Sequence, residues 1–204
     1  MHYLVLLGAI VSLYGIAHYI RDIFHGQTKP NLITWVLWAL APLVASAAAI
    51  STGARWAVLP TFMVGLGPLL VVISALIKRR AIWRPKNFDY LSGGFSFVAI
   101  LLWAVTRKPG MAVLFAILSD GLAALPTLIK AWQFPKTESG IVYTTALFNI
   151  MTSFAAIQNY TFSEIGFPIY NTLLNIALSL VVYRSVLFNV VKTTSNTGMD
   201  QPLL

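Results

Sequence analysis

The chain has 204 residues, of which 58% are hydrophobic and only 10% are charged, and its formal net charge is +8. A soluble domain carries about 25% charged residues, so this composition indicates a polytopic membrane protein. The basic residues lie in short connectors between apolar runs, which is typical of a membrane protein oriented by charge and not of one that binds nucleic acid. The absence of cysteine excludes disulfides, thiolate metal sites and a cysteine nucleophile.

Seven apolar runs are long enough to cross a bilayer, which takes ~17–25 residues of helix. In chain order they cover residues 3–24, 32–51, 56–77, 88–106, 111–133, 140–160 and 165–188. We interpret the first run as a membrane span and not as a signal peptide, because it has no basic region before it and is too long. The connectors are short, so consecutive helices are expected to lie antiparallel; the longest basic connector covers residues 78–86.

The distribution of Lys and Arg predicts the orientation. With seven spans, 11 of the 14 basic residues fall on the side of the first, third and fifth connectors and the C-terminus. Only Arg55, Arg107 and Lys108 fall on the other side. The positive-inside rule therefore predicts an N-terminus outside and a C-terminus in the cytoplasm.

The order of features along the chain indicates an internal repeat. A shift of 109 residues lays residues 15–21 over 124–130, and residues 28–33 over 137–142, with matching connector lengths. The fourth helix is then an unpaired linker, which gives both halves the same orientation. We predict an all-α polytopic membrane protein of seven helices arranged 3+1+3. Its parts are a first three-helix bundle at 1–80, the basic loop and linker helix at 81–109, a second bundle at 110–190 and a cytoplasmic tail at 191–204.

Two stretches of the second half carry a family resemblance. They are Pro126–Lys130, near the cytoplasmic end of the fifth helix, and Lys136–Gly140, the lysine- and hydroxyl-rich entry into the sixth. With the 3+1+3 plan, they make the chain similar to the PQ-loop superfamily, which includes the SWEET (MtN-saliva type) sugar transporters. The resemblance implies solute transport, helix prolines that act as hinges, and asparagines of the seventh helix at the substrate. The positions that match are the prolines Pro126 and Pro42 and the asparagines Asn171 and Asn175.

Asp120 is the strongest single candidate for function. It lies in the middle of the fifth run, where an acid costs ~2.5–3.5 kcal/mol on insertion and usually faces the bundle interior, a partner or a water-filled pathway. As a carboxylate it would bind a cation, receive a substrate hydroxyl or amine, or carry a proton. The structural alternative is that it pairs with a neighbour such as Asn149 and only fixes helix packing.

Polar side chains recur at helical spacing on the two helices after Asp120. The sixth helix has Thr145, Asn149, Thr152 and Ser153, and the seventh has Asn171, Asn175 and Ser179. Singly, such residues join helices for only ~0.6 kcal/mol each. Stripes in phase on neighbouring helices, together with an ionisable group, favour a polar cavity. In the first half, Trp38 lies deep enough to stack on a solute.

These observations predict a membrane transporter that moves a small polar solute, a sugar or a similar metabolite, by alternating access around a midplane site. We expect Asp120, Asn149 and Asn175 to contact the solute, and Asn171 and Thr145 to support them. Trp38 is the predicted stacking wall. Transport is expected to be proton-coupled if Asp120 titrates, and uniport if it does not.

The predicted partners are a small-molecule solute and the lipid bilayer, with a homo-oligomer left open and no nucleic acid. We expect a multi-pass protein of the cell (plasma) membrane, with no cofactor, no metal and no enzymatic activity, because no catalytic motif occurs. The alternative is a non-transporting membrane scaffold or assembly protein whose polar residues only hold helices together.

Overall fold

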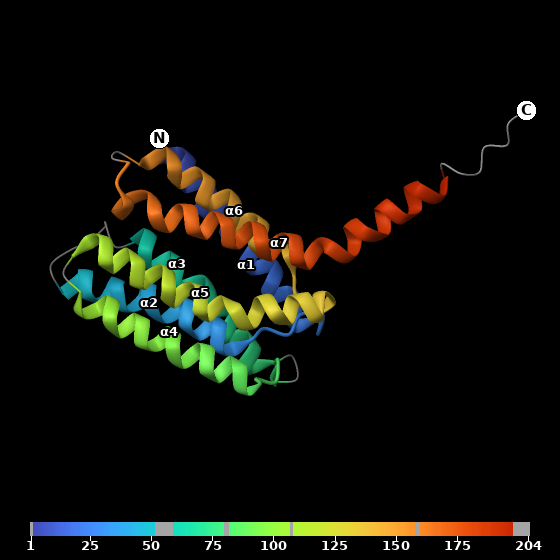
Figure 1. The fold of residues 1–204 in the computed structure, drawn as a ribbon, viewed down its shortest axis with the longest axis horizontal. Coiled ribbons are helices and arrows are strands. Elements are labelled where there is room, and N and C mark those ends of the chain that lie inside the picture. Colours follow the sequence, from blue (N-terminus) through green and yellow to red (C-terminus); the bar gives the residue numbers. More distant parts are fainter. Residues whose placement is uncertain (1, 52–58, 80–81, 107, 158–159, 198–204) are drawn as a thin grey trace, which may run out of the picture.

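The computed structural model describes residues 2–51, 59–79, 82–106, 108–157 and 160–197. Within these ranges the chain forms seven α-helices and two short 3-10 helices, and no strand (Figure 1). The helices are α1 (His2–Phe24), α2 (Leu32–Ser51), α3 (Leu59–Ile77), α4 (Asn87–Val105), α5 (Pro109–Gln133), α6 (Gly140–Ser153) and α7 (Phe162–Thr197). The 3-10 turns are η3 (Pro135–Thr137) and η4 (Phe154–Ala156).

The prediction of an all-helical protein with seven helices is confirmed. Five helices begin and end within three residues of the apolar runs, because the length of the run fixes them. α6 is shorter than its run and ends at Ser153, where the chain tightens into η4. α7 is longer than its run and continues to Thr197, into a polar stretch.

Four helices are long and apolar enough to cross a membrane. These spans are Leu6–Phe24, Asn87–Val105, Gly110–Gln133 and Glu164–Arg184, and their mean hydropathies are between 1.2 and 2.0. The other three helices contain shorter apolar stretches, at Leu32–Ala47, Phe62–Ile77 and Gly140–Thr152. Large apolar side chains cover the outside of the bundle, including Tyr3, Ile10, Phe95 and Leu180. So much exposed apolar surface requires a lipid environment.

The helices lie roughly along one direction and alternate in sense, so the connector residues 25–31, 82–86 and 134–139 share one end of the bundle (Figure 1). We call this the basic end. α3 packs against both α1 and α2, and α7 packs against both α5 and α6. Between the N-terminal and C-terminal groups of helices, α1 packs on α6 and α2 packs on α5. α4 lies against α5 and α2.

Local signals fix the helix boundaries at the basic end. Gly26, with a φ of 74°, follows the end of α1 in the left-handed conformation that glycine adopts without strain. Asn31 caps α2, because its Oδ1 accepts the N–H of Ile33 at 3.1 Å. Asp89 in the first turn of α4 accepts the N–H of Lys86 at 2.9 Å. The chain thus turns at defined positions, which places the connectors that carry the polar network described below.

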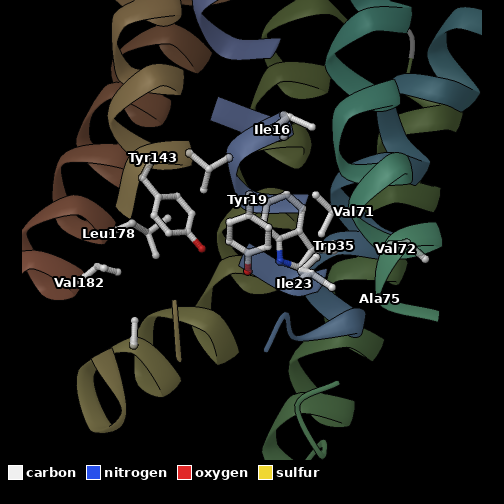
Figure 2. Close-up of a cluster of buried hydrophobic side chains, with 12 residues drawn as sticks. Ile16, Tyr19, Ile23, Trp35, Val71, Val72, Ala75, Tyr143, Leu178 and Val182 are labelled. Atoms are coloured by element: carbon white, nitrogen blue, oxygen red, sulfur yellow. The ribbon is translucent and has the colours of Figure 1, made fainter. Parts of the chain in front are cut away.

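An aromatic cluster forms the centre of the core near the basic end (Figure 2). The ring of Trp35 lies 4.8 Å from that of Tyr19 and 5.4 Å from that of Trp38, centroid to centroid. Apolar side chains from α3, α6 and α7 close around them, among them Val71, Val142 and Leu178. Side chains from both ends of the sequence therefore build one core.

Candidate functional site

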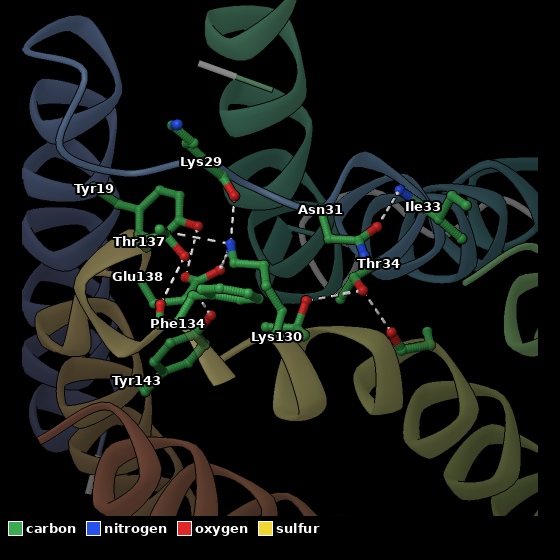
Figure 3. A network of polar contacts seen from close by, with 12 residues as sticks. Tyr19, Lys29, Asn31, Ile33, Thr34, Lys130, Phe134, Thr137, Glu138 and Tyr143 are labelled. Carbon is green, nitrogen blue, oxygen red and sulfur yellow. Dashed lines mark hydrogen bonds and ion pairs between the residues drawn. The ribbon is translucent and has the colours of Figure 1, made fainter. Parts of the chain in front are cut away.

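A buried ion pair lies at the basic end (Figure 3). Lys130 lies in the last turn of α5, and Glu138 follows η3 directly before α6. The two side chains are in contact and only 1% and 0% exposed. A buried pair of charges is tolerated only when further hydrogen bonds satisfy both groups.

Each partner of this ion pair is supplied with such bonds. Glu138 Oε2 accepts the hydroxyls of Tyr19 at 2.8 Å and Tyr143 at 3.0 Å. Lys130 Nζ donates to the carbonyl of Lys29 and, at 3.4 Å, to that of Thr137. We call Tyr19, Lys29, Lys130, Thr137, Glu138 and Tyr143 the Lys130–Glu138 network.

The Lys130–Glu138 network joins segments far apart in the sequence. Tyr19 comes from α1 and Lys29 from the α1–α2 connector, whereas the other members lie on α5, on α6 and in the connector between them. A backbone bond from Lys29 N to Thr137 O, 3.0 Å long, ties the two connectors directly. The ammonium of Lys130 also lies 5.5 Å from the centre of the Trp83 ring, so a residue between α3 and α4 contacts the network as well.

A second polar contact links α5 to α2 one turn further from the basic end. Thr127 Oγ1 donates to Thr34 Oγ1 at 3.0 Å, and Thr34 Oγ1 donates to the carbonyl of Ala123 at 2.7 Å. Both threonines are fully buried. Ser96 of α4 makes a similar bond to the carbonyl of Ser119, at 2.7 Å. Hydroxyl-to-carbonyl bonds of this kind join helices without placing a charge in the bilayer.

Asp120 lies half-buried on α5 and accepts a hydrogen bond from Tyr170 of α7 at 2.9 Å. The ring of Tyr170 packs over Gly121, where a Cβ would meet the phenol oxygen at 3.2 Å. The partner of the acid is therefore a tyrosine of the neighbouring helix, and not Asn149.

Asn149 and Thr145 lie on the face of α6 that meets α1. A Cβ added to Gly8 would lie 2.7 Å from Asn149 Oδ1, and one added to Gly15 would lie 1.8 Å from Thr145 Oγ1. Thr145 donates to the carbonyl of Ile141 at 2.8 Å. These two predicted solute-binding residues thus pack against α1 where glycines leave room for their side chains.

The two predicted asparagines of α7 bond to one another. Asn175 Nδ2 donates to Asn171 Oδ1 at 2.6 Å and to the Asn171 carbonyl at 2.9 Å. Trp38 lies half-buried on α2, and its buried indole N–H has no hydrogen-bond partner among the described residues. Trp38 and Leu174, the residue before Asn175, pack against the same aromatic cluster. Trp38 and the residue before Asn175 thus contact one common cluster, whereas the two asparagines bond to each other.

Pro126 and Pro42 both lie inside helices, in α5 and α2. Pro126 is fully buried, and the carbonyl of Pro42 accepts the hydroxyl of Ser46 at 2.7 Å. α3 and α7 contain Pro68 and Pro168 at interior positions as well, which the sequence analysis did not consider as hinges.

Two shallow grooves lie on the outside of the bundle. One, of about 360 Å³, lies between α2 and α4 and is lined by Leu32, Ile33, Val36, Leu37, Tyr90, Gly93 and Gly94. The other, of about 240 Å³, lies between α6 and α7 and is lined by Met151, Phe154, Ile169, Thr172 and Leu173. Neither groove is lined by a predicted solute-binding residue.

Seven antiparallel helices with apolar outer faces and a buried polar network define a polytopic helical membrane protein. In comparisons with known proteins, no family model, curated protein or solved structure matches this chain.

The sequence analysis missed the Lys130–Glu138 network and its tyrosines. Lys130 was counted only as an orientation signal, although it lies inside the apolar run 111–133 as Asp120 does. A second charge within a span is itself a signal of a buried partner. Its partner was not predictable, because Glu138 lies in a connector that the sequence places in water.

Proposed function

We propose that the protein is a transporter of a small polar solute that works by alternating access. The observation that carries the proposal is the Lys130–Glu138 network, in which buried hydrogen bonds fasten α1 and its connector to the α5–α6 connector at one end of the bundle. A buried ion pair adds little net stability compared with apolar packing. The ion pair does fix one arrangement of the helices around it, and water can hydrate its charges when this edge of the bundle opens. Both properties suit a gate.

The pattern of helix contacts supports two repeated bundles. If α5, α6 and α7 correspond to α1, α2 and α3, each half shows the same internal contacts. In the first half α3 packs on α1 and α2, and in the second half α7 packs on α5 and α6. The contacts between the halves correspond in the same way, because α1 packs on α6 and α5 packs on α2. This is the contact set expected of two parallel three-helix bundles related by a pseudo-two-fold axis, with α4 as the linker.

The proposed binding level lies near the bilayer centre. Asp120 lies ten residues before Lys130 on α5, a distance of ~15 Å, which is about half of a hydrocarbon core of ~30 Å. We assign solute contact to Asp120 and Asn175, and stacking to Trp38. Tyr19 and Trp35 close the proposed site on the side of the basic end. Asn149 and Thr145 line the α1–α6 interface, and Asn171 orients Asn175. The prolines Pro126 and Pro42 are the proposed hinges.

The basic end is the proposed cytoplasmic side. It holds the three connectors rich in Lys and Arg, so the positive-inside rule supports an N-terminus on the outer side. The proposed location is the cell (plasma) membrane.

Uptake into liposomes tests the proposal. Purified protein is reconstituted and offered labelled sugars and amino acids, with and without a pH gradient. We expect saturable uptake of at least one solute that falls strongly in Asp120→Ala, and a loss of the response to pH in Asp120→Asn. Tyr170→Phe is the matched control, because it removes only the hydrogen bond to the acid. Uptake unchanged in Asp120→Ala and Asn149→Ala contradicts the site.

The second candidate function is a non-transporting scaffold. The observation in its favour is that Asp120 is paired with Tyr170, and Asn175 with Asn171, so these polar groups already serve as links within and between helices. A scaffold predicts no uptake across the panel, together with a loss of folding and not of flux in the Asp120 variants.

A further inference from the structure

The groove between α2 and α4 differs from the α6–α7 groove in where it lies. Its walls are apolar except for Tyr90, and it begins at the basic end, since Leu32 and Tyr90 lie in the first turns of α2 and α4. From Leu32 to Leu37 the groove extends ~8 Å along the axis of α2, which corresponds to the upper part of one leaflet. It thus lies at the depth of the first methylene groups of a lipid, directly below the headgroups.

Basic residues precede both helices that form this groove. Arg84 and Lys86 are exposed and stand immediately before α4, and the exposed Lys29 stands shortly before α2. A backbone bond from Trp83 N to the carbonyl of Pro30, 3.2 Å long, holds the basic connector beside the start of α2. The nearby Asp89 is buried and turned toward the backbone of Lys86. The rim therefore presents positive charge above an apolar slot.

The floor of the groove is open because of a glycine. A Cβ on Gly94 would meet nothing within 4 Å, whereas one on Gly93 would meet Ile33 at 2.6 Å. Gly93 lets α4 pack on α2, and Gly94 leaves space that a flexible chain can fill. A gap of this kind beside a lipid-facing surface loses dispersion contacts unless something occupies it.

We propose that this groove is a binding site for an anionic phospholipid of the leaflet at the basic end. One acyl chain lies in the slot over Gly94, the glycerol region lies beside Tyr90, and the phosphate is held by Arg84 and Lys86. Charge complementarity selects a lipid over a second copy of the chain. Two copies inserted in the same orientation and joined through this face would bring their basic connectors together, which is repulsive.

The α6–α7 groove provides an internal comparison. It is also apolar, but it lies toward the opposite end, and the sequence contains no Lys or Arg between Lys136 and Arg184. A lipid acyl chain can therefore lie in this groove, but no cation from residues 137–183 is available to bind the lipid headgroup. Selectivity for anionic lipid is therefore expected at the first groove alone.

The test is native mass spectrometry of the full-length protein after incubation with vesicles of equimolar dioleoyl phosphatidylglycerol and dioleoyl phosphatidylcholine. Wild type is expected to retain phosphatidylglycerol in preference. Each cation near the surface contributes roughly fivefold in affinity, so Arg84→Gln/Lys86→Gln is expected to reduce the preference about 25-fold. Gly94→Leu, which fills the slot, is expected to abolish specific retention, whereas Gly94→Ala leaves most of it.

Two control variants separate this site from diffuse attraction. Lys108→Gln removes a cation at the opposite end, and Thr172→Leu fills space in the α6–α7 groove; both are expected to retain phosphatidylglycerol as wild type does. Elution as a single symmetric peak verifies that each variant is folded. Equal retention of the two lipids by wild type, an unchanged preference in the double variant, or unchanged binding in Gly94→Leu would each overturn the proposal.

Discussion

Tyr19 and Tyr143 form a matched pair for testing whether the two bundles separate at the basic end. Both donate to the same oxygen of Glu138, at 2.8 Å and 3.0 Å, and both are buried. They differ in where they come from: Tyr19 lies on α1, in the first proposed bundle, and Tyr143 lies on α6, in the same bundle as Glu138. The variants Tyr19→Phe and Tyr143→Phe each remove one hydroxyl and leave the ring in place.

The expected size of the effect follows from the type of bond. A hydrogen bond to a charged group is worth ~1.5–3 kcal/mol net. If opening parts Tyr19 from Glu138, Tyr19→Phe favours the open state by that amount, which is about a 10- to 150-fold gain in its population. The Tyr143 bond is kept in both states, so Tyr143→Phe lowers the stability of both and leaves the opening equilibrium nearly unchanged.

A single introduced thiol measures the opening, because the chain has no cysteine of its own. Ala124 is fully buried on α5, and six residues, or ~9 Å, separate it from Lys130 in the direction of the bilayer centre. In Ala124→Cys protein, a membrane-impermeant maleimide added from the basic end reacts at a rate that follows the open population. We expect Tyr19→Phe to raise this rate at least tenfold and Tyr143→Phe to leave it as it is. Equal rates in the two variants would refute the idea that the bundles part along the Tyr19–Glu138 contact.

Two further variants test the packing by thermal unfolding in detergent. Lys130→Met leaves Glu138 charged and buried, and is expected to cost ~3–5 kcal/mol; Lys130→Met/Glu138→Gln is expected to cost less than the sum of the single changes, and strict additivity would show that the pair is not coupled. Gly15→Ala places a methyl group against Thr145 and is expected to cost ~1–3 kcal/mol. Thr145→Ala is expected to recover part of that loss, and no recovery would locate the strain elsewhere.

The sequence predicted the helices well because their boundaries depend on local properties. Apolar length determined α1, α2 and α5, and their ends lie within two residues of the predicted runs. α6 was predicted too long because the apolar run continues past Ser153, whereas the helix tightens into η4 there. Periodicity reports which residues favour a helix, but not where its last turn changes geometry.

The partners of the polar residues were less predictable. Asp120 was identified from its depth alone, but its bond to Tyr170 joins residues 50 positions apart and depends on the register of α5 against α7. The stripe of Thr145 and Asn149 was identified from spacing, whereas the glycines of α1 that receive it have no side chain to mark an interface. Contacts of this kind are set by tertiary packing, which a single sequence does not encode locally.

The polar contacts divide into two classes with different consequences for motion. The bonds of Tyr170 to Asp120 and of Asn175 to Asn171 lie within the second proposed bundle, so they are preserved when that bundle moves as a rigid body. The bonds of Tyr19 to Glu138 and of Thr34 to Ala123 cross between the bundles, and any separation must break them.

The crossing bonds differ in what replaces them after separation. Lys130 and Glu138 lie beside the connectors, where water can hydrate the charges once the basic end opens, so the loss of their buried contacts is largely offset. Thr34 lies deeper, but the carbonyl of Ala123 remains within its own helix, and the threonine hydroxyl can return to a carbonyl of α2. Both crossing contacts thus have low-cost alternatives. The proposed transport cycle needs such alternatives, because its closed and open arrangements must differ by only a few kcal/mol. A purely structural clamp at this end would be expected to use apolar side chains, whose separation in water has no such compensation.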